Sequence, residues 1–164
     1  MKVQDVMNEN VKSCQPNTSL AEATGMMWDY DCGVLPVVAD GGETVGVITD
    51  RDIAMAVGTR HLPAWAIPVG DVMSKALYSV SPSDDIHTAL KLMRKDKVRR
   101  LPVINTEGAL EGILSLNDIA LHAEHPNGKK APGLNYEDVV STLKAVCEHR
   151  HSKVAKELHN TATT

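Results

Sequence analysis

Two corresponding places in the sequence, directly after an apolar run that begins with Gly, put a hydroxyl side chain three residues before a carboxylate: Thr49 precedes Asp52, and Ser115 precedes Asp118. Each pair follows a short apolar run and precedes a helical pattern, so we expect both pairs at strand-to-helix junctions. There the hydroxyl caps the helix and the acid at the third helical position hydrogen-bonds back. The same geometry also suits binding, because a helix start attracts phosphate and a carboxylate accepts hydrogen bonds from a ribose diol. The residues alone leave capping and ligand binding both open.

The two junctions belong to a longer internal repeat. Residues 3–7 (VQDVM) recur at 69–73 (VGDVM), and residues 35–37 (LPV) recur at 101–103, with a constant offset of 66 residues and no gap. A period of this length indicates one supersecondary unit used twice. Two like units must pack on each other, so we expect a ligand in the clefts between them.

Each copy is predicted to follow the order strand, helix, strand, strand, helix. Polar clusters before a helical pattern mark the helix starts, and short β-branched runs ended by turn residues mark hairpins. The first copy is expected to have a strand at 13–14, a helix after 17–19, strands at 34–38 and 45–48, and a helix over 49–57. The second copy is expected to have a strand at 79–80, a helix after 83–85, strands at 100–104 and 110–114, and a helix over 115–124.

The repeat also predicts the domain boundaries. A Pro-containing stretch separates the two copies, and a second break rich in Pro, Gly and Lys precedes a last helical pattern outside the repeat. The expected divisions are a first repeat at 1–60, a linker at 61–68, a second repeat at 69–124, a linker at 125–135, a C-terminal helix at 136–159 and a disordered tail at 160–164.

Composition limits the class of protein. The 164 residues include no Phe, so the core must be aliphatic, and the net charge of −4 argues against a nucleic-acid footprint. Three scattered Cys residues without a CxxC motif are typical of reduced thiols in a cytoplasmic protein. The N-terminus has no apolar signal region, and no apolar run approaches the ~18 residues that span a bilayer. We therefore expect a cytoplasmic protein without a membrane or nucleic-acid partner.

The tandem copies, the LPV strand and the G-x-x-[TS]-x-x-D junction together resemble the CBS domain family over residues 3–120. The resemblance implies an α/β (α+β) fold of two tandem β-α-β-β-α CBS repeats packed with pseudo-two-fold symmetry, here followed by a C-terminal helix. Such a pair, a Bateman module, binds adenosine-containing ligands (AMP, ADP, ATP, NAD or S-adenosylmethionine) in its clefts without catalysis. The resemblance also implies a homodimer, with no required cofactor.

The resemblance assigns residues to a first cleft, where the junction of the first copy faces the second copy. Asp52 is expected to hold the ribose, and Thr49 the phosphate together with an arginine, whose planar fork suits phosphate. Tyr78 or Leu77 is expected to line the adenine pocket. The full set implied for this cleft is Thr49, Asp50, Arg51, Asp52, Leu77, Tyr78, Arg99 and Arg100.

A second cleft is implied by the same symmetry. Gly33 and Val34 stand where Arg99 and Arg100 stand in the other copy, so this cleft is expected to lack the guanidinium pair, which Lys12 replaces only in part. We therefore predict unequal clefts, the first better suited to a phosphorylated ligand. The set implied for the second cleft is Lys12, Gly33, Val34, Ser115, Asn117 and Asp118.

A metal site is the remaining chemical possibility. Cys147 and His151 lie four residues apart, on one face of the predicted C-terminal helix, as two metal ligands would. No second pair of ligands lies nearby in the sequence, so an ordinary amphipathic helix is the better interpretation, and no metal is expected.

Two other functions stay open beside the regulatory module. One is an interaction protein whose clefts are unoccupied and whose C-terminal helix binds a client protein; both hydroxyl–carboxylate junctions are then helix caps alone. The other, which the sequence favours least, is a metal-dependent enzyme built on the His-rich C-terminal segment.

Overall fold

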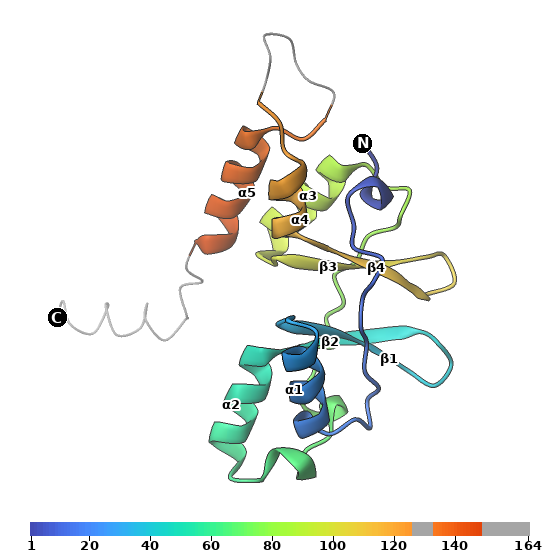
Figure 1. The fold of residues 1–164 in the computed structure, drawn as a ribbon, viewed down its shortest axis with the longest axis vertical. Helices are drawn as coiled ribbons and strands as arrows, with labels where there is room; N and C mark the ends of the chain where they lie inside the picture. The colour runs from blue at the N-terminus through green and yellow to red at the C-terminus, as the bar shows by residue number, and fades with distance from the viewer. Residues whose placement is uncertain (126–132, 149–164) are drawn as a thin grey trace, which may run out of the picture.

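The chain forms two stacked lobes in a computed structural model, which describes residues 1–125 and 133–148. Figure 1 shows a hairpin from each lobe facing the other across the middle, with the helices on the outer sides. The first lobe contains α1 (Leu20–Asp29), β1 (Val34–Val38), β2 (Thr44–Thr49), α2 (Asp50–Arg60) and the short turns η2 (Ala64–Ala66) and η3 (Val69–Asp71). The second contains η1 (Val3–Asp5), α3 (Ile86–Asp96), β3 (Arg100–Ile104), β4 (Leu110–Ser115), α4 (Leu116–His122) and α5 (Tyr136–Cys147).

The two hairpins have the same register. In the antiparallel pair β1–β2, Pro36 lies opposite Val47, and in β3–β4, Pro102 lies opposite Ile113. The predicted first strand of each copy is present only as a single parallel bridge, made by Cys14 to Val37 in one lobe and by Val80 to Val103 in the other. The α/β fold class and the duplicated arrangement are therefore confirmed, with each first strand shorter than predicted.

The repeated VxDVM segments are exchanged between the lobes. Residues 3–7 pack on the second lobe, where the Val3 amide donates to Asp84 O at 2.9 Å. Residues 69–73 pack on the first lobe, where the Val69 amide donates to Thr18 O at 2.8 Å. Val3 and Val69 are fully buried in the two cores. The expected division at 1–60 and 69–124 thus describes the repeat in the sequence, while each lobe takes one segment from the other copy.

The exchange continues as an extra β-bridge on each hairpin. Ser74 pairs with Val47 of β2, and Asn8 pairs with Ile113 of β4. A Cβ on Gly46 would lie 2.5 Å from Ser74 O, and one on Gly112 would lie 2.9 Å from Asn8 O. Both copies therefore need glycine here, because the exchanged backbone lies against the strand.

Helix starts follow the predicted capping signals. Ser19 caps α1 through the Glu22 amide, and Asp85 caps α3 through the His87 amide. The ends differ from the predictions: α2 continues to Arg60, and α4 stops at His122, after which Glu124 forms a bridge to Asn135. Tertiary contacts of the following chain, rather than helical propensity, end α4.

The C-terminal helix is shorter than the predicted 136–159. It ends at Cys147, since Glu148 takes an extended conformation with ψ of 122°. The rest of that predicted helix and the predicted tail at 160–164 lie outside the described residues, as does 126–132 of the predicted linker. Thr142, on the inner face of α5, is fully buried and accepts a hydrogen bond from Arg94 of α3 at 2.9 Å.

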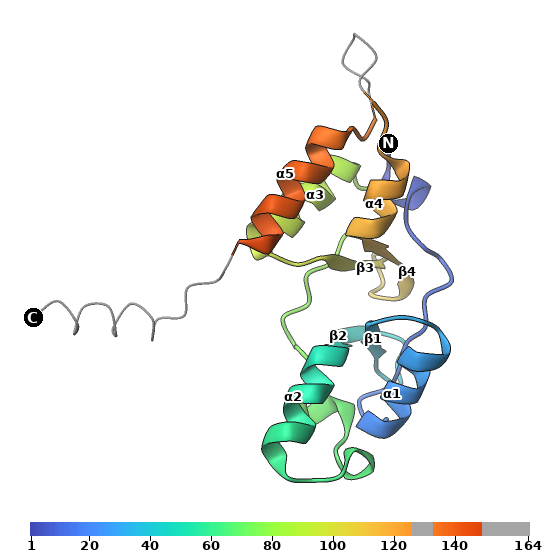
Figure 2. The same cartoon turned by 60° about the vertical axis from the view of Figure 1, so that its left-hand side comes forward.

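Within residues 1–125 and 133–148, only the second lobe has a helix over its outer face. Figure 2 shows α5 lying against α3 and α4, with no equivalent helix over α1 and α2 among the segments drawn in colour. Trp28, which occupies the position of Arg94 in the repeat, is 86% exposed, and Trp65 is 72% exposed. The first lobe therefore presents a partly apolar helical face to solvent.

Candidate functional site

Both hydroxyl–carboxylate pairs form capping boxes. Thr49 Oγ1 donates to Asp52 Oδ2 at 2.7 Å and accepts from the Asp52 amide at 3.2 Å. Ser115 Oγ and Asp118 Oδ2 make the same contact at 2.6 Å, again with the return bond from the amide at 3.2 Å. The capping interpretation is confirmed at both junctions. The capping contact occupies Oδ2 of each carboxylate, so a ligand would have to be bound through Oδ1.

The start of α2 has little hydrogen-bonding capacity left for a phosphate. The Asp50 amide donates to Gly33 O at 3.3 Å, and the Arg51 amide donates to Asp50 Oδ1 at 2.7 Å. The Asp52 amide donates to the Thr49 hydroxyl. Helix amides bind anions only where they are free. The amides at this helix start already have acceptors, so the predicted phosphate binding at this junction stays a prediction that depends on side chains.

The first cleft lies between the α2 junction and β3 and has a volume of about 370 Å³. Six of the eight residues assigned to it line the cavity: Thr49, Asp50, Arg51, Tyr78, Arg99 and Arg100. Asp52 and Leu77 do not. Seven lining residues were not assigned to this cleft from the sequence. Four are apolar side chains from the hairpins, Val34, Val47, Pro102 and Ile113; Ala76, Lys97 and Val98 complete the set.

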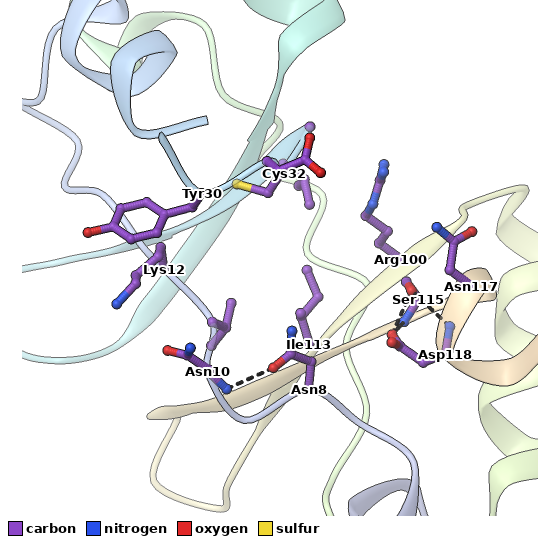
Figure 3. Close-up of a pocket in the computed structure, with 14 residues that line it drawn as sticks. Asn8, Asn10, Lys12, Tyr30, Cys32, Arg100, Ile113, Ser115, Asn117 and Asp118 are labelled. Carbon is purple, nitrogen blue, oxygen red and sulfur yellow. Dashed lines mark hydrogen bonds between the residues drawn. The ribbon is translucent and has the colours of Figure 1, made fainter. Parts of the chain in front are cut away.

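The second cleft lies between the Ser115 junction and the chain before β1, with a volume of about 380 Å³. All six residues assigned to it line the cavity: Lys12, Gly33, Val34, Ser115, Asn117 and Asp118. Lys12 Nζ also lies 4.7 Å from the centre of the Tyr30 ring, a cation–π distance. Figure 3 shows the Ser115–Asp118 pair on one side of this cavity and Lys12 with Tyr30 on the other.

Arg100 lines both clefts, so the second cleft has one guanidinium of the pair, and the predicted inequality of the clefts stays a prediction. It begins β3, opposite Ser115 in the register, so its long side chain stands where the two clefts meet. Figure 3 shows it beside Asn117. The second cleft therefore contains a guanidinium contributed by the second copy, which position-by-position comparison of the copies could not reveal. Of this arginine pair, Arg99 lines the first cleft and does not line the second.

Gly33 makes room at this meeting point. A Cβ there would lie 2.9 Å from Asp50 Oδ2 and 3.8 Å from an Arg100 terminal nitrogen. An added Cβ would push on the Asp50 carboxylate and would make only ordinary contact with Arg100. Steric fit therefore explains glycine at position 33, in addition to the place assigned to Gly33 in the second cleft.

A third cavity of about 250 Å³ adjoins the two clefts, and we call it the α5 pocket. Its wall includes Leu143 and Cys147 of α5, which no sequence argument placed near a cleft because α5 lies outside the repeat. Its other lining residues are Arg99, Arg100, Ser115, Leu116 and Asn117.

Metal and nucleophilic chemistry find little support in the described part of the chain. Residues 1–125 and 133–148 contain no cluster of three or more His, Cys, Asp or Glu side chains placed to hold a metal ion, and His151 lies outside them. Burial raises the pKa of the Cys14 thiol to about 11, so this thiol stays protonated near neutral pH. Within the same ranges, no helix has the length and hydropathy to cross a membrane.

Comparison with known proteins gives a consistent result. A family model described as the CBS domain matches residues 3–59 and 69–124. The CBS domain-containing protein YhcV of Bacillus subtilis is 35% identical over 120 residues, covering 73% of this chain and 84% of that protein. Hypoxic response protein 1 of Mycobacterium tuberculosis is 31% identical over 144 residues, covering 87% of this chain and 92% of that protein.

A solved structure adds a ligand complex to this comparison. The crystal structure of CBSX2 in complex with AMP is similar to this chain with a TM-score of 0.64 and 28% sequence identity. The similarity covers 73% of this chain and 93% of that one.

Proposed function

The chain belongs to the CBS domain family as two CBS domains in tandem, and from this premise we propose that it is a regulatory module for an adenosine-containing ligand. The observation that carries the proposal is the second cleft, where Ser115, Asn117 and Asp118 of one copy face residues of the other copy across one cavity. Its volume of about 380 Å³ lies in the range of small-molecule sites, roughly 300–1,000 Å³. The AMP complex of CBSX2 supports the ligand class.

We assign the ribose to Asp118. Its Oδ2 is held by the Ser115 hydroxyl and amide, at 2.6 and 2.8 Å, which orients the carboxylate and leaves Oδ1 to accept from the ribose hydroxyls. Asp118 lines the second cleft, whereas Asp52 lines neither cleft. This makes the second cleft the better ribose site. The ribose role first assigned to Asp52 remains a prediction, and the experiment below tests it.

Arg100 is the group that connects ligand binding to the arrangement of the lobes. It reaches both clefts from the start of β3, and a phosphate bound by its guanidinium would contact both lobes at once. A ligand shifts a conformational equilibrium by its difference in affinity between the states. A nucleotide bridging the lobes therefore favours one arrangement of them. The module performs no chemistry on the ligand.

Isothermal titration of the full chain with AMP, ATP, NAD and S-adenosylmethionine tests this function. The matched variants are Asp118→Asn and Asp52→Asn, which disturb the same capping box in the two lobes. Loss of a charged hydrogen-bond acceptor should weaken adenosine binding about tenfold in Asp118→Asn, and Asp52→Asn should bind within about twofold of the parent. Absence of binding by all four ligands at millimolar concentration excludes the proposal. Equal effects of the two variants exclude the assignment to Asp118.

The homodimer implied by the family resemblance is part of the proposal. The supporting observation is that the part of the chain that the structure describes leaves Trp28 and Met55 exposed on α1 and α2 of the first lobe. Sedimentation equilibrium measures the oligomeric state directly. Trp28→Glu should weaken the dimer, while Leu62→Glu, in the linker after α2, should leave it unchanged. A monomeric parent would contradict this part of the proposal.

A second candidate function, capture of a client protein by the C-terminal helix, has one observation in its favour. Tyr136, Val140 and Leu143 recur at helical spacing on α5 and are between 44% and 50% exposed. If this is the function, Val140→Glu should abolish capture of the client protein. Titration with nucleotides should then show no binding to either the parent or the variant.

A further inference from the structure

The α5 pocket adjoins the second cleft, and the two share three lining residues. Arg100, Ser115 and Asn117 line both cavities, so these side chains form the boundary between them. We propose that the α5 pocket binds the terminal phosphates of an adenosine di- or triphosphate. The ribose would lie at Asp118, and the 5′ phosphates would pass along Arg100, Ser115 and Asn117 from the second cleft into the α5 pocket. This inference rests on the function proposed above.

The charge of the α5 pocket suits phosphate. Arg99 and Arg100 supply two guanidinium groups, and Ser115 and Asn117 supply hydroxyl and amide groups. Among residues 1–125 and 133–148, no carboxylate lines this pocket, whereas Asp31 and Asp118 line the second cleft. Phosphate oxygens bind best to paired guanidinium donors, and the absence of a lining carboxylate removes the main source of repulsion.

The side chains, rather than the start of α4, carry this binding. The Leu116 amide donates to Arg99 O at 3.0 Å, and the Asp118 amide donates to the Ser115 hydroxyl at 3.2 Å. The backbone carbonyl of Arg99 is thereby held against the helix start. This fixes the main chain from which both arginine side chains project, one residue apart, toward the pocket.

Helix α5 forms one side of the pocket. Leu143 and Cys147 line it together with the arginines, and the helix is held on α3 by the bond from Arg94 to Thr142. Because α5 lies beyond the two CBS domains, the preference for terminal phosphates belongs to this chain's own C-terminal helix. The number of phosphates on the bound nucleotide would also decide whether the ligand contacts α5.

The test compares AMP, ADP and ATP by isothermal titration on the full chain, with a carboxylate placed in the pocket wall by Leu143→Glu. The parent should bind ATP about tenfold more tightly than AMP, the effect expected of one additional charged hydrogen bond. Leu143→Glu should remove that advantage by repelling the terminal phosphates and leave AMP affinity within about twofold. Val140→Glu is the matched control, since Val140 lies on α5 with similar exposure (50% against 44%) and does not line the pocket.

A second probe keeps the result clear if Leu143→Glu does not fold. Inorganic tripolyphosphate should compete more strongly with ATP than with AMP on the parent protein, because Arg100 is shared by the two cavities and Arg99 is not. Equal affinities for AMP and ATP, or equal competition of tripolyphosphate with both, would overturn the α5 pocket assignment while AMP binding upholds the proposed function. Absence of binding by all three nucleotides would instead overturn the proposed function.

Discussion

The ammonium group of Lys97 lies 2.9 Å from a carboxylate oxygen of Glu148, and the same Lys97 side chain lines the first cleft. Lys97 is the left-handed residue that ends α3, with φ of 53°, and Glu148 directly follows α5. One ion pair therefore connects the rim of a cleft to the end of the helix that lies outside the repeat. A bound anion in the first cleft would compete with Glu148 for this ammonium group.

The strength of that pair should be modest. Glu148 is 74% exposed at its side chain and Lys97 is 27% exposed, so water and salt screen the attraction. A double-mutant cycle of Lys97→Met and Glu148→Gln, read by urea unfolding, should give a coupling free energy of about 0.2–1 kcal/mol. The coupling should shrink in 1 M NaCl. A coupling that salt leaves unchanged would mean that the pair is not held by charge.

Glycine at position 46 should be indispensable for the exchange of segments. A Cβ at Gly46 would lie 2.5 Å from Ser74 O, so Gly46→Ala must push the exchanged backbone away and should cost about 1–3 kcal/mol of unfolding free energy. Gly25 lies inside α1 with no atom near its Cβ position, so Gly25→Ala should instead stabilise the protein by up to about 1 kcal/mol. Urea unfolding of both variants measures the contrast. Similar effects at the two positions would contradict the close approach.

Acid should weaken the start of α3. Hydrogen bonds from the His87 backbone and then its side chain hold the pKa of Asp85 below its ordinary value of 3.8. A carboxyl whose pKa is lower in the folded state contributes stability above its unfolded pKa and loses it as pH falls through the folded value. The contribution of Asp85 should therefore be complete at pH 5 and decline below about pH 4.

Thermal unfolding from pH 6 to pH 2 measures this dependence. Asp85→Asn keeps a capping side chain but does not titrate, so its melting temperature should fall less steeply with acid than that of the parent. Parallel curves for the two proteins would show that Asp85 does not contribute to the acid sensitivity.

The three cysteines should react in an order set by exposure and pKa. Burial raises the pKa of Cys14 to about 11, and its side chain is 5% exposed, whereas Cys147 is exposed at the end of α5. Because the thiolate is the reactive form, iodoacetamide at pH 8 should label Cys147 first and spare Cys14 in the folded protein. Peptide mass spectrometry after short labelling reads the order. Early labelling of Cys14 would show that the first lobe opens readily.

Local features of the chain could be predicted because neighbouring residues cause them. The capping boxes at Thr49 and Ser115 depend on side chains three residues apart, and the hairpins depend on β-branched runs between turns. The constant offset of 66 residues then implied two like units and clefts between them, and the family model matches both units. Each of these inferences needed only short-range chemistry or the comparison of one segment with another.

Contacts between distant segments decided the rest. The offset shows that residues 3–7 resemble residues 69–73. It does not show that each segment packs in the other lobe, because Val3 would be an apolar residue of the same pattern whichever lobe buried it. Arg100 was assigned to one cleft because side-chain reach is invisible in a sequence, and the fold places it where both clefts meet. Helix α5 lies outside the repeat. Only its packing on α3 and α4 reveals that Leu143 and Cys147 line the α5 pocket together with the arginines.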